Sequence, residues 1–151
     1  MGILGTLFGV GKLPPLMAAA AADPRALLVV EGSRTKASGS MKTSRRYASR
    51  FISIHGGALV VLPDRVLMSS GRYVVVDEWP GAVGEPISTV VRVAEDGLRV
   101  TIDVAAAVGG TGTVEVEHRS PIPPHVLAAF PTQEWQGTLA GPDPQQTLRK
   151  I

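Results

Sequence analysis

Hydrophobic and polar residues alternate strictly in the second half of the chain. From Leu98 to Val104 every other residue is apolar and the intervening positions are polar, and residues 113–117 alternate in the same way. Side chains on one face of a β-strand recur every second residue. The pattern therefore predicts antiparallel strands with one face in the core and one in water. Asp96-Gly97, ahead of the first of these strands, favours a tight hairpin with residues 89–93.

The first half of the chain holds shorter apolar segments that are rich in β-branched residues. Strands are predicted at residues 25–31, 51–54, 58–62, 66–68 and 72–76. Pro63-Asp64 lies between two of them, with proline at the first central position of a tight turn. Together the segments predict a mainly β protein, a bent antiparallel barrel of about seven strands.

A helical pattern follows these strands. One apolar face at helical spacing is formed by Ile122, Val126, Leu127 and Phe130. Prolines precede this face, where they suit a first helical turn, and Pro131 ends it. The pattern predicts one short C-terminal helix that covers an open end or face of the sheet. Residues 132–151 are predicted to be an extended tail, with Trp135 and Leu139 as anchors.

The first 22 residues are apolar but interrupted. They carry one charge, Lys12, and contain four glycines and the pair Pro14-Pro15. A membrane-spanning helix needs about 20 apolar residues, and a secretory signal begins with positive charge, although the alanine run 18–22 keeps a signal peptide as an alternative. Residues 1–22 are therefore predicted to be an arm that packs on its own domain or on a partner, ahead of a barrel domain at 23–131. The predicted docking residues are Leu4, Leu7, Phe8, Leu13, Leu16 and Trp135.

Composition narrows the classes of function. The chain has 151 residues, 44% of them hydrophobic, which suits one domain with one core. Its 15 basic and 13 acidic residues leave a net charge of +2, a surplus too small to favour a nucleic-acid binder. The absence of cysteine excludes disulfides, thiolate metal sites and cysteine nucleophiles, and it agrees with a reducing cytosol.

Positive charge is concentrated between residues 32 and 50. No acidic residue occurs between Glu31 and Asp64, and the segment is rich in serine, threonine and glycine. It is predicted to be a long basic loop, or a β-ribbon with a mobile tip, that contacts an anionic surface. The alternative is a solvated loop whose charge aids solubility. The predicted contact residues are Arg34, Lys36, Lys42, Arg45, Arg46 and Arg50.

Catalytic and metal-binding patterns are weak in this sequence. The three histidines have no metal-ligand spacing. Glu115 and Glu117 share one face of a predicted strand, whereas His118 points to the other face, where a partly buried and hydrogen-bonded histidine is favoured. The sequence predicts a protein without enzymatic activity, metal or cofactor.

One segment resembles a known family. Residues 57–71, Gly-Ala-Leu-Val-Val-Leu-Pro-Asp-Arg-Val-Leu-Met-Ser-Ser-Gly, resemble the central hairpin of bacterial pleckstrin-homology-like domains, where Thr-Asp-Arg-Arg joins two apolar strands. Here Pro63 replaces the threonine and Val66 the second arginine. The resemblance covers residues 25–130 and implies a bent barrel with a C-terminal helix. It also implies that the basic segment corresponds to the family's phosphoinositide-binding loop, with its cations at Lys36, Lys42, Arg45 and Arg46.

These patterns predict a non-enzymatic interaction or scaffold module of a bacterial cytoplasm. It is expected to dock through residues 1–22 on a partner protein or on the inner face of the membrane. The predicted partners are a protein or a second copy of the chain, and an anionic membrane surface, but not nucleic acid. Two alternatives stay open: a small β-barrel that binds or acts on an apolar ligand, and an anionic-lipid binder that uses residues 34–50.

Overall fold

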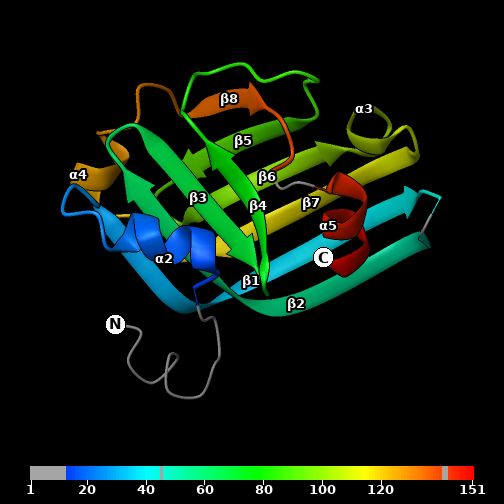
Figure 1. Ribbon diagram of the computed structural model, residues 1–151, viewed down its shortest axis with the longest axis horizontal. Coiled ribbons are helices and arrows are strands. Elements are labelled where there is room, and N and C mark those ends of the chain that lie inside the picture. Colours follow the sequence, from blue (N-terminus) through cyan, green and yellow to red (C-terminus); the bar gives the residue numbers. More distant parts are fainter. Residues whose placement is uncertain (1–12, 45, 141–142) are drawn as a thin grey trace.

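In the part of the chain that the structure describes, eight antiparallel strands form one curled sheet (Figure 1). The computed structural model describes residues 13–44, 46–140 and 143–151. Its strands are β1 (Leu28–Lys42), β2 (Tyr47–Leu62), β3 (Arg65–Ser70), β4 (Tyr73–Glu78), β5 (Thr89–Ala94), β6 (Gly97–Asp103), β7 (Thr111–Arg119) and β8 (Glu134–Gly137). They pair in the order β4-β3-β2-β1-β7-β6-β5-β8, and the sheet curls into a nearly closed barrel. The predicted mainly β, bent antiparallel barrel is confirmed, with eight strands instead of about seven.

Tight turns connect the strands at both predicted places, and the second turn lies one residue earlier than its predicted position at Asp96-Gly97. Leu62 pairs with Arg65 across Pro63-Asp64, and Ala94 pairs with Gly97 across Glu95-Asp96. The alternating strand at residues 98–104 ends one residue early, because the Asp103 side chain accepts hydrogen bonds from the backbone N–H groups of Ala105 and Ala106. This cap begins the short helix α3 (Val104–Val108) between β6 and β7.

The C-terminal segment differs from its prediction. The helix predicted after the prolines is the single turn α4 (Pro124–Leu127), which buries Val126. Residues 132–151 were expected to be an extended tail, but they form β8, which pairs with β5, and a second helix, α5 (Pro144–Lys150). Helix α5 begins where the Asp143 side chain accepts a hydrogen bond from the N–H of Gln146, and it buries Leu148. The short C-terminal helix of the barrel is therefore α5.

Apolar side chains fill the barrel and also cover part of its outside. The inward-facing side chains of the strands form one hydrophobic cluster, which Leu148 and Ile151 complete. Residues 57–62 lack alternation because both of their faces are buried. Their outer face packs against helix α2 (Pro15–Ala21), which contributes the fully buried Met17 to a second cluster. The described part of the predicted arm therefore packs on its own domain.

A carboxylate joins the two edge strands of the sheet. Glu78, at the end of β4, accepts hydrogen bonds from Trp135 Nε1 on β8 at 3.0 Å and from Thr89 Oγ1 at 3.2 Å. Gly137 leaves the space that the carboxylate occupies, because a Cβ at this position would overlap it. Burial raises the pKa of Glu78, and the hydrogen bonds from Trp135 and Thr89 oppose that rise. We call these contacts the Glu78 seam.

Candidate functional site

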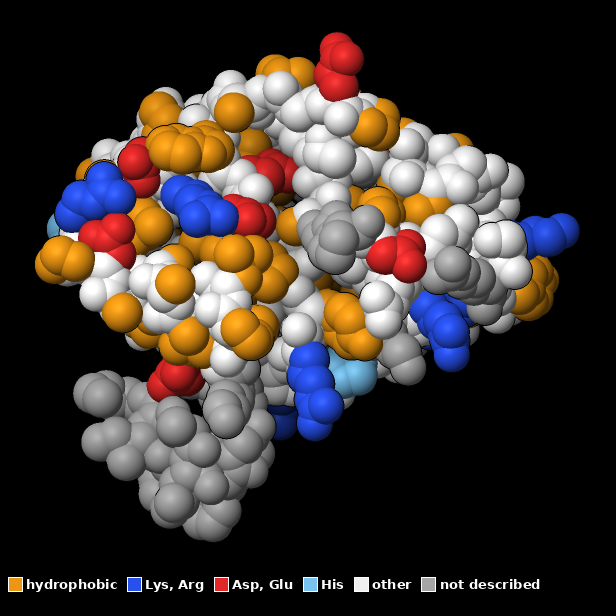
Figure 2. Space-filling view, viewed as in Figure 1, with side chains coloured by type: hydrophobic (Ala, Val, Ile, Leu, Met, Phe, Trp, Pro, Cys, Tyr) orange, Lys and Arg blue, Asp and Glu red, His pale blue; other side chains and the backbone are white. Residues whose placement is uncertain are grey.

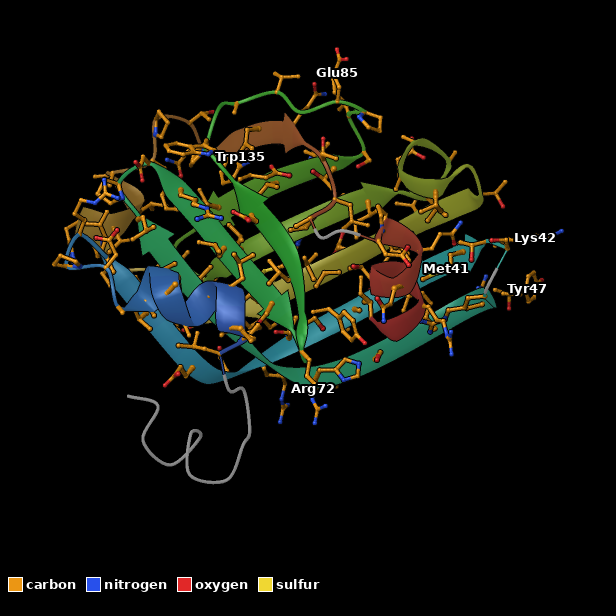
Figure 3. All side chains as sticks on the ribbon, in the orientation of Figure 1. Met41, Lys42, Tyr47, Arg72, Glu85 and Trp135 are labelled. Carbon is orange, nitrogen blue, oxygen red and sulfur yellow. The ribbon has the colours of Figure 1, made fainter. Side chains whose placement is uncertain are left out.

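The basic segment forms a long β-ribbon, one of its two predicted forms. β1 and β2 pair without a break from Ser33 opposite Gly57 to Gly39 opposite Phe51. One bulge follows, and the pairing ends at Lys42 opposite Tyr47. We call residues 33–57 the ribbon. Figure 3 shows its tip, where Lys42 and Tyr47 project away from the barrel.

The outer face of the ribbon combines exposed apolar and basic side chains. Lys36 on β1 lies opposite Ile54 on β2. The exposed fractions are 74% for Tyr47, 70% for Ile52 and 57% for Ile54, so these apolar groups are largely in water. Arg50 lies at the bulge and lines, together with Ile52, a hollow of about 650 Å³. Figure 2 shows basic side chains at the lower and right edges of the molecule, where Figure 3 labels Arg72 of the turn between β3 and β4 and Lys42 at the tip of the ribbon.

Four of the predicted cations have no ion-pair partner in the part of the chain that the structure describes. Within the described residues, no ion pair involves Arg34, Lys36, Lys42 or Arg50. The next part of the same sheet differs, because Glu117 on β7 lies between Arg99 at 3.1 Å and Arg119 at 3.0 Å. The unpaired positive charge of the ribbon therefore does not extend over the β6–β7 surface.

Arg46 has a structural role that the sequence did not indicate. Its guanidinium donates hydrogen bonds to the carbonyls of Leu148 at 3.1 Å and Arg149 at 3.0 Å, at the end of α5. It also lies 4.8 Å from the centre of the Phe51 ring. Arg46 thus connects the ribbon to α5. We therefore no longer count it among the residues predicted to contact an anionic surface. Arg45 lies outside the described residues.

The predicted docking residues are divided among different environments. Leu16 on α2 is 49% exposed, whereas Leu13 is partly buried against the second cluster. Trp135 is 4% exposed, stacks on Phe130 with ring centres 5.9 Å apart, and belongs to the Glu78 seam. Its indole therefore packs in the core of the protein and presents no docking surface. Leu4, Leu7 and Phe8 lie outside the described residues.

The titratable groups of the described residues form no catalytic set. His118 is 1% exposed, and burial lowers its pKa to about 4. Its Nε2 lies 3.1 Å from Ser33 Oγ, but its Nδ1 has no hydrogen-bond partner among the described residues, so no carboxylate orients the ring. A second pair, Ser53 Oγ and His55 Nε2, is 2.6 Å apart on the inner face of the ribbon. His118 was predicted to be partly buried, but in the structure it is almost completely buried.

Other surface features offer fewer groups for binding. A hollow of about 640 Å³ is bordered by Arg92, Arg99 and Arg119, each of which is paired with a glutamate. The described residues contain no cluster of three or more metal-ligating side chains. They also contain no helix that is long and apolar enough to cross a membrane.

Comparison with known proteins identifies no relative of this chain. No family model matches it, and no curated protein or solved structure matches it either. The geometry of the ribbon is thus the main basis for a functional proposal.

Proposed function

We propose that this chain is a non-enzymatic interaction module that docks on an anionic membrane surface through the outer face of its ribbon. The observation that carries the proposal is the presence of exposed Ile52, Ile54 and Tyr47 beside cations that have no ion pair in the described residues. Apolar side chains can enter the interfacial region of a bilayer while lysine and arginine contact the headgroups. The bent barrel and the C-terminal helix α5 are in keeping with a pleckstrin-homology-like domain, which we propose as its family.

The spacing of the cations favours an approach along the ribbon and not by its tip alone. Lys36 and Lys42 are six residues apart on β1, or about 20 Å at about 3.3 Å per residue. The electrostatic screening length is about 8 Å at physiological salt, so a membrane that meets only the tip would attract Lys42 and leave Lys36 screened. If the ribbon lies flat on the membrane, Lys36, Lys42 and Arg50 reach the surface together. At about 1 kcal/mol per cation, their electrostatic attraction to the membrane amounts to about 3 kcal/mol.

Vesicle co-sedimentation tests the proposal with a charge-matched control. The test variant is Lys42→Ala/Arg50→Ala, and the control is Arg25→Ala/Arg92→Ala, which removes two exposed arginines elsewhere that have acidic partners. On vesicles of phosphatidylcholine and phosphatidylserine, we expect the test variant to bind about 30-fold more weakly, from about 2 kcal/mol of lost attraction. The control is expected to bind like the wild type. Equal losses in both variants would show that net charge, and not the ribbon, determines binding.

The same assay separates the ribbon from the N-terminal arm, the docking element that we predicted from the sequence. Deleting residues 1–22 would remove Met17 and open the second cluster, so a chain of residues 13–151 is the cleaner comparison. We expect this chain to keep its affinity for anionic vesicles. If it fails to bind while the ribbon variant binds normally, the arm is the docking element and the ribbon proposal is wrong.

A further inference from the structure

β2 is paired along its whole length on one side only. On that side β1 accompanies it from Tyr47 to Val61. On the other side β3 pairs only with residues 57–62, and no described strand pairs with residues 47–56. Figure 1 places this part of β2 at the rim of the molecule. We call residues 47–56 the open edge.

The backbone groups of two isoleucines point to the open edge. The carbonyl of Gly56 accepts a hydrogen bond from Gly71 N at 2.8 Å, so it points away from β1. Backbone groups of alternate residues in a strand point to the same side, and β2 is regular from Gly57 to Phe51. Ile54 and Ile52 therefore present their N–H and C=O groups outward. Their side chains are also largely exposed.

The open edge has little of the usual protection against strand pairing. Natural edge strands are commonly blocked by proline, inward charges, bulges or a covering segment. Residues 47–56 contain no proline and no acidic residue, and the single bulge lies at its far end, beyond Phe51. The regular part that has no backbone partner on this side, residues 51–55, is left as a template for another strand.

We propose that two copies of this chain pair antiparallel along the open edge, about a twofold axis at Ser53. This register places Ile52 opposite Ile54 of the second copy, so the residues with outward backbone groups meet as hydrogen-bonded pairs. Their exposed side chains then pack on the same face, in two equivalent pairs. Arg50 falls opposite Gly56 of the second copy, so no two cations are directly opposed.

Neighbouring registers fit less well, which makes the proposed one specific. An axis at Ile52 would place Arg50 opposite Ile54, and an axis at Ile54 would place Ile52 opposite Gly56. Only the axis at Ser53 matches the two isoleucines with each other. The resulting contact is isologous, and it joins two outer faces of the ribbon side by side in one continuous sheet.

Sedimentation velocity over a range of concentrations tests the pairing without any lipid. The wild type is expected to form a dimer. Ile54→Pro removes one outward N–H while leaving the hydrogen bonds to β1, and proline is tolerated at such a position of an edge strand. We expect this variant to associate at least tenfold more weakly, with an unchanged far-ultraviolet circular dichroism spectrum. A dimer that persists in the variant would rule out the open edge as the interface.

A cysteine scan tests the register itself, because the chain has no cysteine of its own. An axis at Ser53 brings the two residues at this position within disulfide distance. Under mild oxidation, Ser53→Cys is expected to cross-link rapidly into a dimer, whereas Ser49→Cys on the same strand is expected to cross-link slowly. Equal rates, or a wild type that stays monomeric at every concentration, would overturn the proposal. Vesicle binding of a monomer would remain measurable, so the two proposals can fail separately.

Discussion

The buried histidine gives a prediction whose size follows from its environment. Burial of His118 lowers its pKa from the ordinary 6.5 to about 4, so the unfolded chain binds this proton more tightly than the folded one. The stability that the protein gains from a neutral His118 is therefore fully present above pH 6.5 and is lost as the pH falls toward 4. One pKa unit corresponds to about 1.4 kcal/mol, so the loss amounts to about 3 kcal/mol.

The perturbation is His118→Leu, which keeps an apolar side chain of similar size in the core and removes the ionisable ring. Urea unfolding at pH 7 and pH 4 measures the free energy of unfolding of the wild type and the variant. We expect the wild type to lose about 3 kcal/mol more than the variant between these two values. His125→Leu is the matched control, because it removes an exposed histidine and leaves the buried His118 in place, and it should follow the wild type. Parallel losses in the wild type and His118→Leu would refute the reasoning.

The remaining predictions concern the Glu78 seam and Arg46. Glu78→Ala leaves Trp135 and Thr89 without their acceptor and is expected to lower the free energy of unfolding by about 2 kcal/mol, measured in urea. Gly137→Ala should act in the same direction, because its methyl group displaces the carboxylate. Burial raises the pKa of Glu78, so stability should fall as the pH rises above 4.5, and Glu78→Gln should remove that loss. Arg46→Ala should lower the free energy of unfolding by about 2 kcal/mol, measured by thermal unfolding. Arg46→Lys should lower it less, because lysine keeps the positive charge but not the planar donors of arginine.

Local patterns predicted the elements that depend on neighbours in the chain. The turn at Pro63-Asp64 was predicted, and the turn at Glu95-Asp96 was predicted to within one residue, because two or three residues determine each of them. β8 was missed because it is four residues long and is stabilised by pairing with β5, about 40 residues earlier in the chain. A strand of this length has no periodicity of its own that could distinguish it from an extended tail.

The charge pattern of the sequence predicted where the candidate site lies, but not which contacts its residues make. A run without acidic residues was enough to locate the basic ribbon. The role of Arg46 could not be predicted, because its acceptors on α5 are 102 and 103 residues away in the sequence. The open edge also escaped prediction, since it exists because β3 has six residues whereas β2 has sixteen. Such a difference in length becomes visible only when the pairing is known.

The Glu78 seam also determines where the barrel can open. Separating most neighbouring strands would break a ladder of backbone hydrogen bonds. Separating β4 from the β8 side breaks the side-chain contacts of Glu78 and, among the described residues, the backbone bond from Ala140 N to Val75 O. Local unfolding with the lowest free energy should therefore begin along this line. Amide hydrogens of β4 and β8 would exchange with solvent before those of β1 and β7, while the rest of the sheet stays folded.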